Sequence, residues 1–490
     1  MSLREFIETL RREGELATIA APVDPYLEMA EIADRASKAG GPALLFERPA
    51  AAGPTGTRPA NAHRLSEAVP PVLMNQFGSY RRLELALGAP LDELAGRIAE
   101  LVDLQVPKGL VGKVKALGQL RELASFSPRI VGKAAFREVT VEPPDLSRLP
   151  VLTTWPGDGG PFVTLPVCVT KDREGRRNAG MYRLQVYDAQ TTGMHWHVHH
   201  DGAANFREAD GRLEVAVALG TDPAVTYAAT APLPAGIDEF MFAGFLRGRP
   251  VELAACATVD LKVPADAEIV LEGYVDKTET RREGPFGDHT GYYSLADDYP
   301  VFHLTAMSMR RDAVYPATIV GRPPMEDCFL GKATERLFLP LLRLTLPEIV
   351  DLELPIEGVF HDCAVISIRK AYPGHARKVM SAVWGMGQMM FTKFVVVVDE
   401  HVDVHDPREV AWRVFNNVDP RRDTMIVDGP LDVLDHSSPT AGYGAKMGID
   451  ATRAWPDEGH PREWPAELAM DPAVKQRVDA RSAELGLPFT

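Results

Sequence analysis

The chain has 490 residues, more than one ordinary hydrophobic core accommodates, so we expect two to four domains. It is 45% hydrophobic and 25% charged, and no apolar run reaches the length of a membrane-spanning helix. The net charge of −15 argues against a nucleic acid or an anionic membrane surface as the main partner.

The chain has four cysteines, and they are too widely spaced to form a recognisable motif. Cys168, Cys256, Cys328 and Cys363 include no C-x-x-C pair, which argues against zinc fingers, iron–sulfur clusters and a disulfide framework. The first residues lack the continuous apolar core of a signal peptide. Together these features predict a cytoplasmic protein.

The first 130 or so residues have a mixed α and β pattern. Residues 2–13 form an amphipathic helix with Leu3, Phe6, Ile7 and Leu10 on one face. A second helix is expected over "LEMAEIADRASKA" and a strand over 42–47. The Pro-, Ala- and Gly-rich stretch 49–71 is typical of a loop, and 79–125 is mostly helical.

Between about 135 and 315 short β-rich segments alternate with turns. Examples are "FVTLPVCVTKD", "NAGMYRLQVYDAQTTGMHWHV" and "AEIVLEGYVD". The pattern indicates a compact antiparallel barrel or sandwich, with one helix inserted at "DEFMFAGFLRG".

From about 320 to 455 the pattern becomes α/β. A helix is expected over 333–349, a strand over "CAVISIRK" and a helix over 374–390. The all-apolar "FVVVVD" at 394–399 then indicates a parallel sheet that is covered on both faces. The tail from 453 could pack on its own domain or on a neighbouring subunit.

The turn "EGPFGDHTGYY" (283–293) places Glu283 and Asp288 five residues apart around two glycines and a proline. Such a turn can direct two carboxylates into one space, where each raises the pKa of the other unless a cation lies between them. Arg183, in "NAGMYRLQ", is a suitable cation because arginine stays charged and binds carboxylates through two nitrogens. The residues alone leave open whether this is a solvated acid pair or a general acid/base pair.

The run "MHWHVHHDG" (194–202) holds His195, His197, His199 and His200. If the run is a strand, the first three side chains share one face and His200 lies opposite. No H-E-x-x-H pattern supports a hydrolytic zinc site, and a single histidine completed by oxygen ligands favours a harder ion such as Mn²⁺ or Mg²⁺. The pattern does not choose among the histidines.

No dinucleotide-binding or P-loop glycine motif is present. "AGYGAKMGIDAT" (441–452) combines flexible backbone with Lys446, which could hold a phosphate, but an ordinary loop fits this stretch equally well.

These motifs together are similar to those of the UbiD family of decarboxylases. "NAGMYRLQ", "EIVLEGYVDKTETRREGPFGDHTGYY", "GRPP" and "GAKMGIDAT" occur in the family's order, and the opening "EGELATIAAPVDPYLEMAEIADRASKAGGPALLFE" also matches. The resemblance extends from the first helix to about residue 460. It implies an α/β (α+β) fold with an N-terminal α/β domain (1–125), a central split β-barrel that binds flavin (126–320) and a C-terminal α/β dimerisation domain with an oligomerising tail (321–490).

The resemblance implies prenylated FMN as cofactor, with Mn²⁺ or Mg²⁺ and K⁺ nearby. By motif match the metal ligands are Asn178, His199 and Glu239, and these would also hold the cofactor together with Arg183 and Lys446, the last near the cofactor phosphate. Backbone groups of 228–231 are the expected K⁺ contacts. The other three histidines of the run become candidates for substrate selection or for support of the metal ligand.

The catalytic set implied by the resemblance is Arg183, Glu283 and Asp288. Loss of CO₂ from an sp² carbon needs an electron sink that no side chain supplies, and the cofactor would supply it. Glu283 would donate the proton, Arg183 would bind the substrate carboxylate, and Asp288 would orient Arg183. Asp288 stands where some relatives have Glu.

The implied reaction is a reversible, non-oxidative decarboxylation of a hydroxybenzoate- or naphthoate-type acid, possible in ubiquinone or menaquinone synthesis. Simple phenolic or heteroaromatic acids are the alternative substrates. A flavin prenyltransferase would supply the cofactor, and a homodimer or homohexamer is expected. Two hypotheses of other classes remain: a metal-dependent hydrolase that uses the histidine cluster, and a non-catalytic flavin-binding partner.

Overall fold

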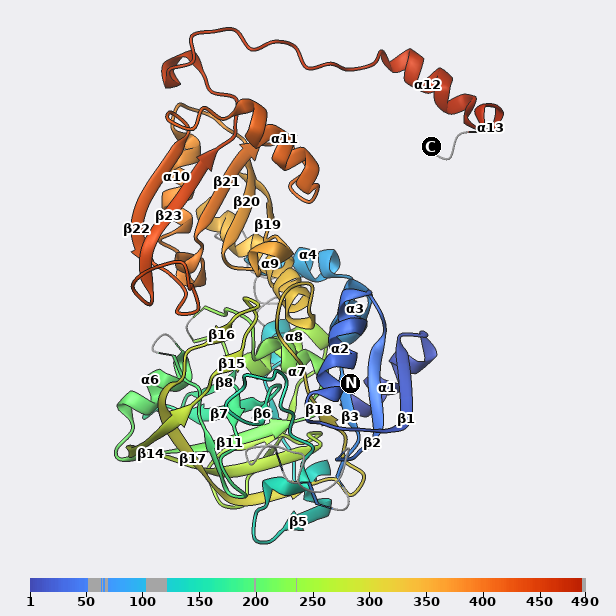
Figure 1. Cartoon of the computed structure of the whole chain (residues 1–490), viewed down its shortest axis with the longest axis vertical. Coiled ribbons are helices and arrows are strands. Elements are labelled where there is room, and N and C mark those ends of the chain that lie inside the picture. The colour runs from blue at the N-terminus through green and yellow to red at the C-terminus, as the bar shows by residue number, and fades with distance from the viewer. Residues whose placement is uncertain are drawn as a thin grey trace.

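The computed structural model describes residues 1–51, 63, 65–66, 69–102, 121–197, 200–234 and 236–486. These residues form two lobes, which Figure 1 shows one above the other. The lower lobe holds the N-terminal and central segments, and the upper lobe holds the C-terminal segment. The helix α9 (Glu326–Thr345) lies between the two.

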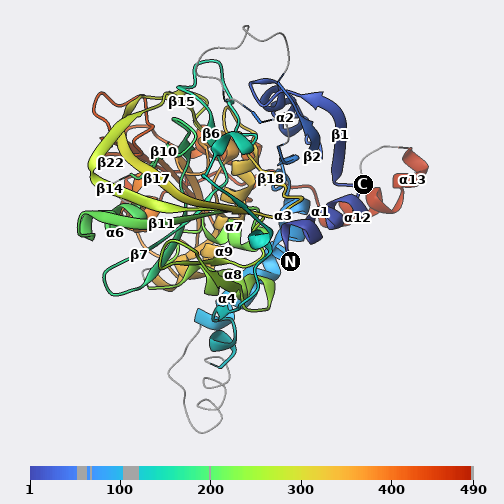
Figure 2. The ribbon, with the colours of Figure 1, turned by 90° about the horizontal axis from the view of Figure 1, so that it is seen from below.

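The N-terminal segment forms a layer beside the central sheet, as Figure 2 shows from below. Its sheet has the order β1-β2-β3-β18, so a strand from the end of the central segment completes it. The elements are α1 (Leu3–Arg12), β1 (Leu16–Val23), α2 (Glu28–Lys38), β2 (Ala43–Pro49), β3 (Val72–Met74), α3 (Tyr80–Leu87), α4 (Leu91–Val102) and β18 (Tyr315–Pro316).

The helix predicted over 2–13 is confirmed as α1. Ser2 caps it, and the Ser2 and Glu5 side chains bind each other's backbone N–H groups, which satisfies donors that a helix start leaves free. Leu3, Phe6, Ile7 and Leu10 are buried and pack in the core that the central strands share. The two layers are therefore joined by one hydrophobic core.

The central segment is built on an antiparallel sheet of order β10-β17-β14-β11-β7-β8, with β5 paired to β17. Its strands are β5 (Val139–Val141), β7 (Val167–Lys171), β8 (Arg177–Met181), β10 (Thr191–Gly193), β11 (Arg212–Leu219), β14 (Ile269–Glu283) and β17 (Asp297–Met309). Alternate residues of these strands face two cores, one shared with α1, α3 and α4 and the other shared with α2 and β2.

Shorter elements surround this sheet. The small ladders join β6 (Phe162–Val163) to β9 (Leu184–Gln185), β15 (Phe286–Gly287) to β16 (Tyr293–Ser294), and β12 (Glu252–Ala255) to β4 (Arg129–Ile130) and β13 (Lys262–Pro264). The helices are α6 (Asp201–Glu208), α7 (Pro223–Ala228) and α8 (Glu239–Arg247), with short 3₁₀ turns η1 (Ala135–Glu138) and η2 (Leu146–Arg148). The helix predicted at "DEFMFAGFLRG" is confirmed as α8.

The C-terminal lobe has a sheet of order β19-β20-β21-β23-β22. The strands are β19 (Ile349–Glu353), β20 (Cys363–Ile368), β21 (Phe394–Asp399), β22 (Thr424–Pro430) and β23 (Tyr443–Asp450), with helices α10 (His375–Val383) and α11 (Pro407–Asn417) and 3₁₀ turns η3 (Ile356–Gly358), η4 (Gly387–Phe391) and η5 (Pro456–Glu458). β21 is parallel to both β20 and β23 and is buried along most of its length, as the apolar run predicts.

The last described residues leave the body of the protein. They carry α12 (Pro472–Ala480) and α13 (Ser482–Leu485), which lie away from both lobes in Figure 1 and contain no buried residue. In the part of the chain that the structure describes, no helix is both long and apolar enough to cross a membrane.

Candidate active site

The side chain of Arg183 lies between two acids, as the sequence motif suggests. Its Nε is 3.1 Å from Glu283 Oε1, and its Nη1 is 2.5 Å from Asp288 Oδ2. Nη2 donates to Ser294 Oγ at 3.3 Å, and the guanidinium lies over the Phe286 ring. The side chains of Glu283 and Asp288 are almost fully buried. Arg183 and two acids that lie 100 and 105 residues later in the chain therefore form one compact charged group, whose catalytic roles stay predictions.

The turn between the two acids is fixed by hydrogen bonds from other segments. Gly284 N donates to Gln185 Oε1 at 2.7 Å, and Gly287 N donates to Asp158 Oδ1 at 2.8 Å. Gly159 N donates to Pro285 O at 2.7 Å. Gly287 must be glycine because an added Cβ would lie 2.1 Å from Trp155 Cδ1. The backbone that directs Glu283 and Asp288 toward Arg183 is therefore held on both sides.

His195 is a neighbour of this group that sequence reasoning did not identify. Its Nδ1 lies 2.7 Å from Glu283 Oε1, the oxygen that Arg183 Nε also contacts. Glu283 Oε2 is buried and has no hydrogen-bond partner among the described residues. An added Cβ at Gly193 would lie 3.0 Å from this oxygen, so Oε2 points toward the end of β10. Glu283 thus has one oxygen held by two donors and one oxygen that no described residue binds.

The described residues of the histidine run do not form a strand, so the premise of a shared strand face is wrong. β10 ends at Gly193, and residues 194–197 have no regular structure. The ladder to β17 stops where Met194 N donates to Pro300 O, because a proline has no N–H to return the second bond. His195 and His197 still meet, with their Nε2 atoms 2.9 Å apart. His199 lies outside the described residues.

Burial and charge set the protonation of these groups. Burial lowers the pKa of His195. Burial, with the repulsion that a protonated His195 or His200 would exert, lowers the pKa of His197 to about 3. Both imidazoles are therefore neutral at pH 7, and a neutral His195 can donate Nδ1–H to Glu283. Burial alone would raise the pKa of Asp288, but hydrogen bonds from His289 and the charge of Arg183 hold it well below its usual range.

Two of the predicted metal ligands lie side by side. Asn178 is on β8, and Glu239 opens α8. Asn178 Nδ2 is 3.3 Å from Glu239 Oε1, and Ala179 N donates to Glu239 Oε2 at 3.1 Å. Burial raises the pKa of Glu239 to about 7, so a nearby cation would stabilise its charged form. The amide and carboxylate oxygens of this pair fit a hard divalent ion.

The segment expected to contact K⁺ lies next to this pair. The carbonyl oxygen of Ala229 accepts a hydrogen bond from Met181 N, at the end of β8, at 3.0 Å. The loop 228–231 is therefore packed against the strand that carries Asn178.

Lys446 is placed in the C-terminal lobe. The stretch "AGYGAKMGIDAT" is not a loop: most of it forms β23, because Tyr443–Asp450 pairs with both β21 and β22. Lys446 is buried, and its Nζ binds the carbonyl oxygens of Met390 and Thr392. Burial lowers the pKa of Lys446 to about 8. Within the described chain, no hydrogen bond or ion pair joins Lys446 to Asn178 or Glu239, and its role at a phosphate stays a prediction.

A different group of metal-capable side chains joins α9 to the C-terminal sheet. Glu335, Glu353 and His405 could share one ion. Lys332 Nζ already binds both glutamates, and His405 binds Glu353. The group is therefore an ion-pair network with its own cations.

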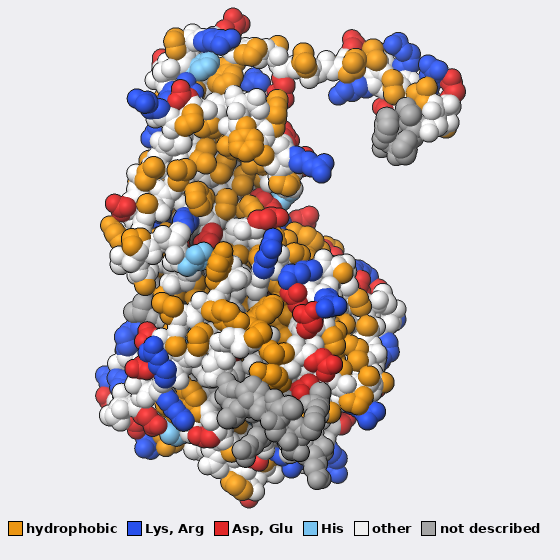
Figure 3. Space-filling model, viewed as in Figure 1, with side chains coloured by type: hydrophobic (Ala, Val, Ile, Leu, Met, Phe, Trp, Pro, Cys, Tyr) orange, Lys and Arg blue, Asp and Glu red, His pale blue; other side chains and the backbone are white. Residues whose placement is uncertain are grey.

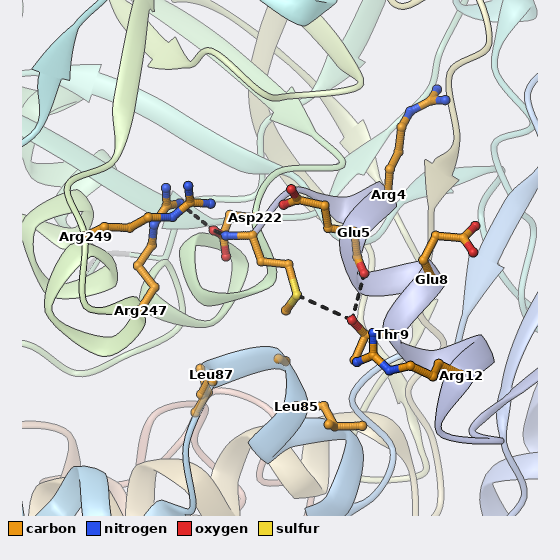
Figure 4. Close-up of a pocket in the computed structure, with 13 residues that line it drawn as sticks. Arg4, Glu5, Glu8, Thr9, Arg12, Leu85, Leu87, Asp222, Arg247 and Arg249 are labelled. Carbon is orange, nitrogen blue, oxygen red and sulfur yellow. Dashed lines mark hydrogen bonds and ion pairs between the residues drawn. The ribbon is translucent and has the colours of Figure 1, made fainter.

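A hollow of about 790 Å³ lies on another face, between α1, the end of α3 and the loops of Asp222 and 247–249. Figure 4 shows its arginines and glutamates together with Asp222. The N-terminal amine of Met1, which also lines the hollow, lies 2.5 Å from Asp222 Oδ2. This hollow shares no lining residue with the group around Arg183.

The chain also matches the models of a known protein family. Models of the three domains of 3-octaprenyl-4-hydroxybenzoate carboxy-lyase, UbiD, match the chain in order: the N-terminal domain at 7–102, the Rift-related domain at 129–323 and the C-terminal domain at 328–451. The chain belongs to the UbiD family. It is therefore a carboxy-lyase, and Arg183, Glu283 and Asp288 all lie in the matched Rift-related domain.

Relatives and solved structures of UbiD type extend over nearly the whole chain. An uncharacterised protein of Archaeoglobus fulgidus is 52% identical over 98% of this chain and 97% of its own length. The vanillic acid decarboxylase of Sedimentibacter hydroxybenzoicus in its closed form is 27% identical, with 99% and 98% coverage and a TM-score of 0.83. The UbiD-class enzyme HmfF of Pelotomaculum thermopropionicum, solved with FMN, is 31% identical, with 97% and 98% coverage and a TM-score of 0.78. An evolved dimeric form of HmfF was solved with prenylated FMN. The predicted α/β fold class is confirmed by these likenesses.

Proposed function

We propose that this UbiD-family chain catalyses the non-oxidative, reversible decarboxylation of an aromatic carboxylic acid of hydroxybenzoate or naphthoate type, with prenylated FMN as cofactor. The observation that carries the proposal is the buried Arg183, which lies between Glu283 and Asp288 in the matched Rift-related domain. A relative solved with prenylated FMN supports the choice of cofactor.

The chain's residues fit the cofactor and its ions. Asn178 and Glu239, with His199, would hold Mn²⁺ or Mg²⁺, and the carbonyl groups of 228–231 would bind K⁺. When bound, prenylated FMN would supply the electron sink that departure of CO₂ from an sp² carbon requires. We infer a structural role for the divalent ion, because its expected ligands lie on a strand and a helix start that are separate from the Glu283 turn.

The side chains of the protein would bind the substrate carboxylate and transfer a proton. Arg183 would bind the substrate carboxylate, and Asp288, held ionised, would keep the guanidinium charged and oriented. Glu283 would give a proton to the carbon that has lost CO₂, and its unpartnered Oε2 is the oxygen available for that transfer. The buried group around Arg183 would exclude bulk water from the proton transfer.

The finer assignments stay proposals. A place in ubiquinone or menaquinone synthesis is one possibility, and simple phenolic or heteroaromatic acids outside those pathways are the alternative substrates. We further propose a cytoplasmic homodimer or homohexamer that receives its cofactor from a flavin prenyltransferase. Family membership removes the support for a metal-dependent hydrolase, and the intact set of Arg183, Glu283 and Asp288 argues against a non-catalytic partner.

The proposed function is tested by co-expression with a flavin prenyltransferase and a decarboxylation screen of aromatic acids. The purified protein should show the absorbance of prenylated FMN only after co-expression, and CO₂ release should depend on this cofactor. Glu283→Gln should keep the absorbance, because the ligands of the metal site are unchanged, and should lose at least about 100-fold in kcat, as expected when a general acid is removed. Full turnover by this variant would exclude Glu283 as the proton donor.

A further inference from the structure

The turn that carries Asp288 also touches the C-terminal lobe. His289, the next residue, has its Nε2 atom 2.7 Å from Nε2 of His361, which lies between η3 and β20. The ring of His289 also stacks on Phe360, with 5.3 Å between centroids and 27° between planes. A direct neighbour of the arginine-orienting acid thus contacts the other lobe.

Hydrogen bonds continue from this contact to Arg183. His289 Nδ1 and its backbone N lie 3.0 and 2.9 Å from Asp288 Oδ1, while Asp288 Oδ2 binds Arg183. A doubly protonated His289 donates to Asp288 through Nδ1 and to His361 Nε2 through its own Nε2. On the far side, His361 Nδ1 lies 3.2 Å from Asp362 Oδ1 but makes no hydrogen bond to the described residues. The row of hydrogen bonds therefore extends from Arg183 through Asp288 and His289 to His361.

The charges around His289 favour this state. Burial would lower its pKa, but the hydrogen bond and charge of Asp288, together with Asp327 of α9 and Asp432 of the β22–β23 loop, raise the pKa to about 9. His289 is consequently charged at neutral pH and can donate from both nitrogens.

The loop that presents His361 has an uncommon backbone. Val359 and Phe360 have φ angles of 45° and 54°, a left-handed region that non-glycine residues seldom adopt and that persists only where surrounding contacts hold it. Phe360 packs against Gly331 of α9, where an added Cβ would lie 2.5 Å from the Phe360 Cβ. The missing side chain at Gly331 allows Phe360 to lie against α9 and brings His361 to His289.

We propose that the His289–His361 hydrogen bond couples the position of the C-terminal lobe to Asp288, and through Asp288 to the guanidinium of Arg183. His289 and His361 are positioning residues: they act through Asp288. When the lobes separate, His289 loses its second partner and Asp288 loses a fixed neighbour. The inference rests on the proposed function, in which Arg183 binds the substrate carboxylate.

The first test needs neither substrate nor cofactor. Hydrogen–deuterium exchange of residues 286–293 and small-angle X-ray scattering are measured on the full chain for wild type, His361→Ala and His401→Ala, an exposed histidine of the same lobe. His361→Ala should speed exchange at least about fivefold and enlarge the radius of gyration, because local opening is no longer resisted. The His401→Ala control should match wild type. Wild-type exchange and size in His361→Ala would overturn the proposal.

Gly331→Ala tests the same coupling without changing a histidine. Alanine has a higher helix propensity than glycine, so the substitution should not lower the melting temperature by weakening α9 as a helix. The added Cβ should nevertheless displace Phe360 and the loop, and exchange in 286–293 should rise as in His361→Ala. A variant with wild-type exchange would show that the loop is not held in this way and would count against the proposal.

Kinetics of the cofactor-loaded enzyme then distinguish the proposed function from the proposed coupling between the lobe and Arg183. His361→Ala should raise KM about tenfold with a smaller fall in kcat, because the carboxylate-binding arginine is less well oriented. His361→Gln, which keeps a polar group at this position, should recover part of the loss. If exchange changes as expected but wild type turns over no aromatic acid, the proposed function fails and the coupling stands. If wild type is active and His361→Ala retains its KM and exchange, the coupling alone is overturned.

Discussion

Glu283 Oε1 has two donors, His195 and Arg183, and His195 is the closer. Since Glu283 is buried, removing the imidazole would leave a carboxyl oxygen short of a partner that bulk water cannot replace. His195→Ala should therefore lower kcat by about 10- to 100-fold, because a buried polar group left without its partner costs about 1–3 kcal/mol. His195→Asn can donate from nearly the position of Nδ1 and should retain most of the rate. Equal losses in both variants, with unchanged melting temperatures, would contradict this role.

His289 makes the pH dependence of stability predictable. Its pKa of about 9 in the folded chain exceeds the unfolded value of about 6.5. The contribution to stability is therefore complete below pH 6.5 and is lost as the pH rises through 9, with a size on the order of 3 kcal/mol. His289→Gln should be less stable than wild type at pH 6, and the difference should shrink by pH 10. Denaturant unfolding at both pH values measures this difference in the free energy of unfolding. A difference that grows with pH would contradict the raised pKa of His289.

At the scale of elements, Asp158 connects two loops at the candidate active site. Its Oδ2 accepts from Thr154 N and Oγ1 and from Trp155 N at 2.8–3.0 Å, while its Oδ1 accepts from Gly287 N. Asp158→Ala would leave these buried donors unpaired and release the turn between Glu283 and Asp288. We expect a loss of about 2 kcal/mol or more in stability and at least a tenfold loss in kcat, checked by denaturation and steady-state rates. A wild-type kcat in this variant would show that the turn is held without Asp158.

The helices and strands also show how much of the fold can be predicted from the sequence. α1, α8 and β21 follow from the spacing or continuity of apolar residues, which is local information, and all three are confirmed. The strand predicted through the histidine run is wrong because its end depends on Pro300 of a partner strand more than 100 residues later in the chain. The motifs of Arg183, Glu283 and Asp288 are recognisable by resemblance, and the structure brings these three side chains together.

The contacts that surround Arg183, Glu283 and Asp288 cannot be predicted from a local pattern or from resemblance. His195 and Glu283 are 88 residues apart, and His289 and His361 are 72 apart. Each of the two pairs depends on how separate elements, or the two lobes, come together. No spacing rule within a single helix or strand joins such positions.

At the scale of the whole molecule, the two lobes leave apolar surface uncovered. Hydrophobic side chains gather over the C-terminal lobe on the face that Figure 3 shows. Trp412 and Phe415 of α11 are exposed, the latter by 82%. The tail adds Leu468 and Met470, and its helix α12 buries nothing against its own chain. A nine-residue helix is unstable alone in water, so α12 needs a partner surface, which the proposed homodimer would provide.

Removal of the tail should therefore weaken the proposed dimer. A chain that ends at Glu467 keeps the ion pair of Glu467 with Arg413, so the C-terminal lobe itself should stay folded. We expect the dimer dissociation constant to rise at least about tenfold, equivalent to about 1.4 kcal/mol, as measured by sedimentation equilibrium. Phe415→Asp, which places a charge on the exposed face of α11, should shift the equilibrium in the same direction, whereas Glu400→Asp on the same lobe should not. Because the Arg183 group lies within one chain, dilution to monomer should leave CO₂ release per chain nearly unchanged, and a proportional loss of turnover would show that the active site needs the second subunit.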